Sequence, residues 1–251
     1  GKSWCLVALG GHAIRMGYNV LHYTLELGED YVGRRYDSFF TKVPVNHIMG
    51  EKDKVEEIIP QLPGKLVIKE FPTGRASIHT VESHIRKCID QDVKPDLILI
   101  DYVDLLSSRR KNVDRKYEID DIYTSTKGLA RELNIPIWSV SQVNRAGAKD
   151  DVIEGDKAAG SYDKIMITDF CLSLSRKSKD KINGTGRFHV MKNRYGMDGL
   201  TYGVKADTST GHFEVHDYNE EDELEAPAKP VNPHSNLDHF DLKKLNQEFN
   251  S

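Results

Sequence analysis

Short apolar runs alternate with helix-like stretches along most of this chain. The runs at residues 19–25, 65–71, 96–101, 136–141 and 169–175 are rich in β-branched residues and are predicted to be strands. The stretches at residues 2–16, 77–90 and 117–133 are predicted to be helices. Such alternation is typical of a parallel sheet covered by helices, so we expect an α/β fold.

Two later apolar runs, at residues 187–192 and 200–205, flank a turn-rich segment. Residues 193–199 of this segment include Asn, Gly and Asp, which favour tight turns. We therefore expect a terminal antiparallel hairpin that closes the edge of the sheet.

The pattern changes after residue 206. Residues 207–225 contain eight acidic residues and neither Lys nor Arg, and residues 226–233 are rich in proline. We expect one α/β domain over residues 1–206, an acidic, proline-containing disordered linker over 207–236 and a short amphipathic segment over 237–251. This last segment either docks a partner or belongs to the solvated tail. Its apolar residues lie near helical spacing: Leu237, Phe240, Leu242, Leu245 and Phe249.

Composition narrows the class of protein. The 251 residues carry a formal net charge of −4 and include three cysteines, which excludes collagen, a disulfide scaffold and a wholly disordered chain. We expect Cys5, Cys88 and Cys171 to be free thiols in a reducing compartment. No apolar run approaches the ~20 residues that span a bilayer, so we expect a cytoplasmic protein with no membrane partner.

The charge is unevenly distributed along the chain. Residues 1–205 carry 32 basic and 28 acidic residues, so the acidic total comes from the tail. A mildly positive body is compatible with binding to nucleic acid.

Two segments indicate nucleotide chemistry. The chain opens on Gly1, Lys2 and Ser3, the second half of the phosphate-binding pattern GxxxxGK[ST], and we expect the first half to lie upstream. In such a loop the lysine binds phosphate oxygens and the serine hydroxyl binds Mg²⁺. The apolar run 97–100 ends in Asp101, which a buried strand would deliver beside that loop as a second Mg²⁺ group. Together the two segments predict an ATP and Mg²⁺ site.

Three further positions are candidates for catalysis. Glu26 follows the first predicted strand, where a carboxylate could orient and deprotonate the attacking water. Gln142 ends another strand and could hydrogen-bond the γ-phosphate. Lys192 and Arg194 lie in the hairpin turn and could reach the ATP of a neighbouring subunit. Each of these residues is also compatible with an ordinary solvent-exposed side chain in a loop or turn, with no catalytic role.

Five segments, in this order, resemble the C-terminal motor domain of DnaB-type replicative helicases, particularly those of T-even type phages. They are the opening GKS, YTLEL with Glu26, LILIDYVDLL with Asp101, KGLARELNIPIWSVSQVNR and KNRYG with Lys192 and Arg194. The resemblance implies a RecA-like P-loop ATPase fold, a homo-hexameric ring, ATP and Mg²⁺ as cofactors, single-stranded DNA as substrate, and a primase and a helicase loader as partners.

The resemblance also implies roles for individual residues. Gly1, Lys2, Ser3 and Asp101 would bind nucleotide, with Ser3 and Asp101 on the metal. Glu26 would be the catalytic base, Gln142 the γ-phosphate sensor, and Lys192 and Arg194 residues that act on the neighbouring subunit. DNA-binding residues would be Arg109, Arg110, Lys111, Arg115, Arg145, Lys149, Lys157 and Gly160. The family's usual DLRESG is DKAAG at residues 156–160 here, so the DNA contacts in that loop differ from the family pattern.

The function predicted from these residues is an ATP-dependent replicative DNA helicase motor. One alternative is a RecA- or KaiC-like ATPase in recombination or regulation, which shares the fold and the phosphate-loop pattern. A second alternative is a non-hydrolysing DNA-binding assembly module that keeps the fold as a scaffold.

Overall fold

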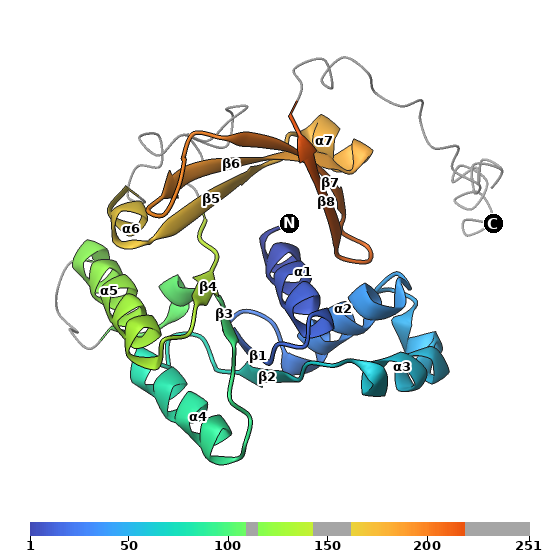
Figure 1. Cartoon of the computed structure of the whole chain (residues 1–251), viewed down its shortest axis with the longest axis horizontal. Helices are drawn as coiled ribbons and strands as arrows, with labels where there is room; N and C mark the ends of the chain where they lie inside the picture. Colours follow the sequence, from blue (N-terminus) through green and yellow to red (C-terminus); the bar gives the residue numbers. More distant parts are fainter. Residues whose placement is uncertain (109–114, 143–161, 219–251) are drawn as a thin grey trace, which may run out of the picture. The chain divides into compact units, whose positions relative to one another are not determined.

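The computed structural model describes residues 1–108, 115–142 and 162–218, and these form two four-stranded sheets with helices around them (Figure 1). The helices are α1 Lys2–Arg15, α2 Glu29–Thr41, α3 Lys52–Ile58, α4 Ile78–Asp90, α5 Arg115–Leu133, α6 Tyr162–Ile167 and α7 Ser178–Asn183. The strands are β1 Val20–Thr24, β2 Leu66–Glu70, β3 Leu97–Asp101, β4 Ile137–Ser139, β5 Phe170–Ser175, β6 Thr185–Asn193, β7 Thr201–Asp207 and β8 His212–Asp217. Short 3-10 turns lie at Ile48–Gly50, Ile59–Gln61 and Val103–Leu105, the last labelled η3. None of the helices in these ranges is long and apolar enough to cross a membrane.

The first sheet is parallel, with the strand order β2-β1-β3-β4. Its four strands fall within the runs predicted at residues 19–25, 65–71, 96–101 and 136–141, so that part of the α/β prediction is confirmed. β1 and β3 are buried along their whole length. A strand buried on both faces must be apolar throughout, which is why these runs stand out in the sequence.

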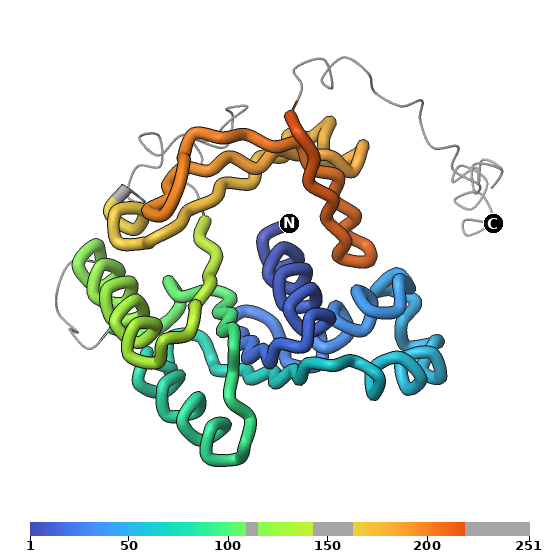
Figure 2. The backbone as a smooth tube through the Cα atoms, viewed as in Figure 1, coloured from blue at the N-terminus to red at the C-terminus, as the bar shows by residue number. Residues whose placement is uncertain are grey.

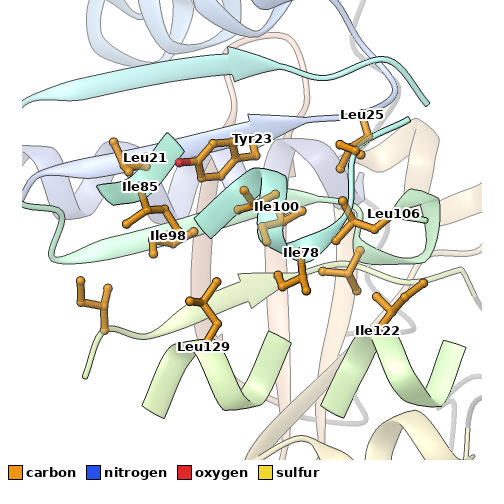
Figure 3. Close-up of a cluster of buried hydrophobic side chains, with 14 of the residues drawn as sticks. Leu21, Tyr23, Leu25, Ile78, Ile85, Ile98, Ile100, Leu106, Ile122 and Leu129 are labelled. Carbon is orange, nitrogen blue, oxygen red and sulfur yellow. The ribbon is translucent and has the colours of Figure 1, made fainter. Parts of the chain in front are cut away.

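Successive residues of β1 and β3 point into two separate cores, one on each face of the parallel sheet. Leu21, Tyr23, Ile98 and Ile100 pack against α4 and α5, as Figure 3 shows for the first core. Val20, Leu97 and Leu99 instead pack against α1 and α2. The twofold period of a strand thus divides the sheet's side chains between the two helical layers.

The second sheet is antiparallel, with the order β5-β6-β7-β8. β6 and β7 form the predicted hairpin, but the expectation that it closes the edge of the parallel sheet is wrong, because the two strands pair with β5 and β8 in this separate sheet. The run at 169–175 was expected in the parallel sheet, and this prediction is wrong, because β5 pairs antiparallel with β6. In Figure 2 the blue-to-green part of the tube holds the parallel sheet and the yellow-to-red part holds this second sheet. A short apolar run identifies a strand but not its partner, so its sheet could not be assigned from the pattern.

The predicted linker begins too early. Residues 212–217 form β8, which pairs with β7 from Tyr202 to Asp207. The linker prediction over 207–236 is therefore wrong for β8, whose acidic residues lie on an exposed strand. Residues 219–251, including the predicted amphipathic segment, lie outside the described residues.

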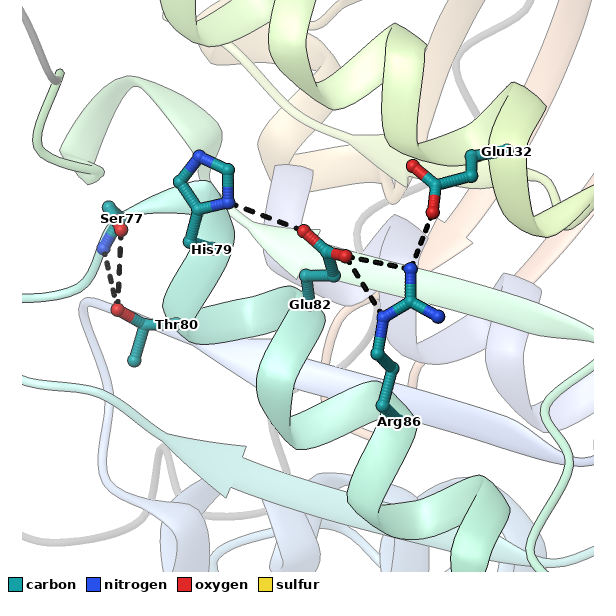
Figure 4. Close-up of polar contacts among 6 residues, drawn as sticks. All are labelled: Ser77, His79, Thr80, Glu82, Arg86 and Glu132. Carbon is teal, nitrogen blue, oxygen red and sulfur yellow. Dashed lines mark hydrogen bonds and ion pairs between the residues drawn. The ribbon is translucent and has the colours of Figure 1, made fainter.

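Helix α4 is joined to α5 by a surface network of charged groups (Figure 4). Arg86 donates from Nε and Nη2 to Oε1 of Glu82 at 2.9 and 2.8 Å, and its Nη2 reaches Oε1 of Glu132 at 2.5 Å. At the start of α4 the N-cap residue Ser77 donates from its backbone N–H to Oγ1 of Thr80 at 3.2 Å, which is one half of a capping box. The charged pairs are exposed, so each contributes little to stability.

Close packing of α1 on α2 depends on glycine. A Cβ added to Gly10 would lie 2.9 Å from Cδ1 of Leu99 and closer still to the hydroxyl of Tyr36. We expect Gly10→Ala to lower the free energy of unfolding by about 1–3 kcal/mol, because the added methyl group overpacks the core. Denaturant unfolding followed by circular dichroism measures this change.

Gly128→Ala is the matched control, since Gly128 lies in α5 with no atom within 4 Å of an added Cβ. There alanine should raise stability by about 0.5–1 kcal/mol, because it restricts the unfolded chain. Equal effects at the two positions would contradict the steric argument.

Candidate functional site

The N-terminal end of α1 carries the candidate phosphate-binding residues. Gly1 is the N-cap of the helix, and Lys2 and Ser3 form its first turn. Lys2 is exposed and Ser3 is half-buried. The unpaired backbone N–H groups of a helix N-terminus, together with the lysine ammonium, favour an anion at this position.

Asp101 lies at the carboxyl end of β3 and is 2% exposed. Burial is the largest influence on its carboxyl group and raises the pKa. A hydrogen bond with Ser3 and the positive charges of Arg35 and Lys2 act in the opposite direction. The structure thus brings Lys2, Ser3 and Asp101 together, although about 100 residues separate them in the sequence.

Glu26 joins the same site from the end of β1. Thr24 pairs with Asp101 in the sheet, and the N–H of Leu25 donates to the carbonyl oxygen of Asp101 at 2.9 Å. The exposed Glu26 carboxylate is close enough that its negative charge contributes to raising the pKa of Asp101. The carboxyl ends of these adjacent parallel strands therefore place one buried and one exposed carboxylate side by side.

Gln142 extends from the neighbouring strand of the same edge. β4 pairs with β3 through Ser139 and Ile100, and the Ser139 hydroxyl donates to the Ile100 carbonyl at 2.8 Å. Gln142 follows three residues later and is exposed. Because β3 and β4 are parallel, Gln142 lies at the same end of the sheet as Asp101.

Lys192 and Arg194 lie at the end of β6 and contact the C-terminal end of α6. The ammonium of Lys192 donates to the carbonyl oxygens of Ile165 and Met166 at 2.8 and 2.6 Å. Arg194 donates to the Met166 carbonyl at 3.2 Å, and its Nε lies 3.3 Å from Oδ1 of Asp169. Within this chain the two cations therefore bind α6 and Asp169.

Asp169 is held in place by a further cation. Lys127 of α5 donates to Oδ1 of Asp169 at 2.7 Å, and this bond is the main reason that the pKa of Asp169 is lowered. Burial in turn lowers the pKa of Lys192, with Arg194 and Lys127 adding to the shift. The carboxylate of Asp169 is thus shared between Lys127 and Arg194.

Most of the predicted DNA-binding residues lie outside the described residues. They are Arg109, Arg110, Lys111, Arg145, Lys149, Lys157 and Gly160. Arg115 is described: it begins α5, is exposed, and bonds to Glu118 at 2.9 Å and to the carbonyl oxygen of Asp104 at 2.6 Å. The side chain of Arg115 is therefore held against η3, the turn that follows β3.

Comparison with known protein families shows the family to which this chain belongs. The DnaB-like helicase C terminal domain family matches residues 1–158. The chain belongs to this family. The DnaB-like match covers α1, the parallel sheet and the ends of β1, β3 and β4, so it includes Lys2, Ser3, Glu26, Asp101 and Gln142.

Individual relatives agree with the DnaB-like assignment. The "DnaB-like replicative helicase" of Enterobacteria phage T4 is 25% identical over 214 residues, which are 78% of this chain and 44% of that protein. A "Probable plasmid replicative DNA helicase" of Chlamydia psittaci is 31% identical over 127 residues, 48% of this chain and 27% of that protein. The chain thus spans less than half the length of these curated relatives.

Solved structures confirm the RecA-like α/β fold of the DnaB-like chain. "The Structure Of A DnaB-Like Replicative Helicase And Its Interactions With Primase" has a TM-score of 0.72 and 17% identity over 87% of this chain and 57% of that one. A second solved structure, described as an "ATPase Domain", has a TM-score of 0.70 and 19% identity, and the match covers 86% of this chain and 82% of that one.

The structure also contains a polar cluster in the DnaB-like fold that the sequence analysis missed. Asp104 of η3 contacts Lys164 of α6, Ser141 after β4 and Tyr123 of α5. One signal was available: Asp104 follows Asp101 by three residues in the quoted LILIDYVDLL segment. Lys164 had no comparable signal, since its pairing with Asp104 depends on where α6 packs.

Proposed function

We propose that this chain is the motor part of an ATP-driven replicative DNA helicase that moves along single-stranded DNA and unwinds duplex DNA. The observation that carries the proposal is the convergence of Lys2, Ser3, Asp101 and Glu26 at one edge of a parallel sheet. Family membership adds support, because the family is defined by a helicase domain.

ATP with Mg²⁺ fits the residues at this edge. Mg²⁺ prefers oxygen ligands and keeps several waters, so one carboxylate and one hydroxyl beside phosphate oxygens are sufficient. Asp101 and Ser3 supply these two groups, while Gly1 and Lys2 lie at the helix end that favours phosphate. The bound ion would neutralise the charge that develops on the transferred phosphoryl group.

Glu26 and Gln142 complete the proposed chemistry within the subunit. Glu26 would accept a proton from the attacking water, and its exposure leaves it free to contact that water. Gln142 would hydrogen-bond the γ-phosphate and respond to its loss.

Lys192 and Arg194 would act on the ATP of the adjacent subunit in a homo-hexamer. Both residues lie at the turn end of β6 in the antiparallel sheet. The phosphate-binding residues lie elsewhere in the chain, at the start of α1. A guanidinium supplied by a neighbour stabilises the transition state only when the ring is assembled, which would link hydrolysis to the ring.

Single-stranded DNA would pass through the ring and contact basic residues by its phosphates. The residues proposed for this contact are Arg109, Arg110, Lys111, Arg115, Arg145, Lys149, Lys157 and Gly160. Binding should therefore weaken with salt and depend little on sequence. A primase and a helicase loader are the proposed protein partners, and the cytoplasm is the proposed location.

The proposed function is tested on the full-length protein by ATP hydrolysis with and without single-stranded DNA and by unwinding of a forked duplex. We expect DNA to stimulate hydrolysis by about fivefold or more and strands to separate only with ATP. Stimulated hydrolysis without unwinding would favour the RecA- or KaiC-like alternative. Absence of both would favour a non-hydrolysing assembly module.

A further inference from the structure

Asp104 is at the centre of a compact polar cluster between α5, α6 and the end of β4. The ammonium of Lys164 pairs with Oδ2 of Asp104 and also donates to the Ser141 hydroxyl at 3.1 Å. Ser141 donates to the same Oδ2 at 3.3 Å. The hydroxyl of Tyr123 donates to Oδ1 at 2.7 Å, and the Lys164 ammonium lies 5.5 Å from the centre of the Tyr123 ring. Both oxygens of the Asp104 carboxylate are thus bonded within the cluster.

This ion pair differs from the surface pairs around it. The side chains of Lys164 and Asp104 are 13% and 16% exposed. A second pair, Lys116 of α5 with Asp163 of α6, also holds α6, at 2.8 Å, but its side chains are 61% and 42% exposed. Removal of one partner from a shielded pair leaves an uncompensated charge, whereas an exposed pair contributes little. The shielded pair therefore constrains α6 much more strongly.

The cluster lies where several functional parts of the chain meet. Ser141 directly precedes Gln142, and Arg115, which begins α5, donates to the carbonyl oxygen of Asp104 at 2.6 Å. Asp104 itself follows Asp101 by three residues, and the N–H of Val103 donates to the Ser139 hydroxyl at 3.0 Å. A shift of α6 would consequently be transmitted to the ends of both β3 and β4.

Helix α6 is also bound at its C-terminal end. Its carbonyl oxygens at Ile165 and Met166 accept hydrogen bonds from Lys192, and Arg194 reaches the second of them. One turn of helix thus contacts the Asp104 cluster through Lys164 and the proposed trans-acting residues through its C-terminal carbonyls. Figure 1 shows α6 beside α5, at the point where β5 begins.

We propose that Asp104 and Lys164 are positioning residues that transmit occupancy of the DNA site to ATP turnover through α6. Neither side chain is proposed to contact nucleotide or DNA. Their role is to fix the position of α6 relative to the ends of β3 and β4. The inference rests on the proposed function, since it specifies how two activities of the same motor are coupled. Packed side chains, hydrogen bonds and ion pairs that have two discrete arrangements can carry coupling of this kind between separate sites.

The test compares Asp104→Asn and Lys164→Gln with wild type in the full-length protein. We expect basal ATP hydrolysis and the affinity for fluorescent oligo-dT to change little, while stimulation by saturating DNA falls by about fivefold or more. The double variant should lose no more stimulation than either single variant, because both remove the same contact. Lys164→Arg keeps the charge and should retain most of the stimulation.

Asp163→Asn is the matched control, because Asp163 neighbours Lys164 in α6 but belongs to the exposed pair. It should behave as wild type. Thermal unfolding of every variant separates a coupling defect from a folding defect, and Ser141→Ala offers a milder disturbance of the same cluster.

Two results would overturn the inference: full stimulation in both single variants, or a loss of oligo-dT affinity so large that raising the DNA concentration further restores full stimulation. Failure of the proposed function gives a different result, since the wild-type protein itself would then show no DNA-stimulated hydrolysis.

Discussion

Glu26→Gln in the full-length protein should bind ATP nearly as well as wild type but hydrolyse it about 100-fold or more slowly. Glutamine keeps the size and polarity of the side chain, but its amide cannot accept the proton of the attacking water. The substitution also removes a negative charge beside Asp101, which favours the ionised form of that carboxyl group. Binding of a fluorescent ATP analogue and steady-state hydrolysis measure the two effects separately.

Glu29→Gln provides the control for this experiment. Glu29 lies three residues further along and bonds through Oε1 to the Lys69 ammonium at 2.9 Å and to the backbone N–H of Glu70 at 2.7 Å. It therefore has a structural partner, and its substitution should leave turnover close to wild type. Unchanged turnover in Glu26→Gln would remove Glu26 from the role of base.

Mixing Arg194→Ala subunits with wild-type subunits should depress ATP hydrolysis more than simple dilution. If Arg194 acts on the ATP of an adjacent subunit, each variant subunit impairs a site whose other residues are intact, and loss of such an arginine costs about 10³-fold or more in that site's rate. The measurement is hydrolysis at fixed total protein while the fraction of variant is raised. A strictly proportional decline would contradict action in trans.

The mixing experiment needs a control for the loss of a positive charge elsewhere on the subunit surface. Lys181 is exposed in α7, so Lys181→Ala should leave hydrolysis unchanged at every mixing ratio. Thermal unfolding of Arg194→Ala alone is also needed, because this variant loses the contacts with Met166 and Asp169 within its own subunit.

The parallel sheet was predictable from the sequence because its central strands are buried on both faces. β1 and β3 had to be continuous apolar runs, and because they are adjacent parallel strands, Asp101 at the end of β3 and Glu26 just after β1 lie at one edge of the sheet. The antiparallel sheet was harder. β8 alternates Phe213 and Val215 with charged residues, and its acidic composition suggested a linker.

Contacts between distant residues were the part that could not be predicted. Lys164 and Asp104 are 60 residues apart, and their pairing depends on the packing of α6 against α5. Helix α2 was missed for another reason: it is largely polar, although Val32, Tyr36 and Phe39 lie at helical spacing on its buried side. Periodicity alone gives too weak a signal when most residues of a helix are polar, even though six residues of α2 are buried.

The close contact between α1 and α2 has a consequence for the chemistry at the sheet edge. Gly10 and Gly11 let α1 approach the rings of Tyr36 and Phe39 with no intervening side chain, which leaves the two helices little room to slide. α1 begins with the proposed phosphate ligands, and α2 begins three residues after Glu26. The close helix contact at Gly10 and Gly11 therefore helps to set the distance between the phosphate ligands and the proposed base, although it contacts neither group. The two glycines would influence the reaction only by fixing this distance.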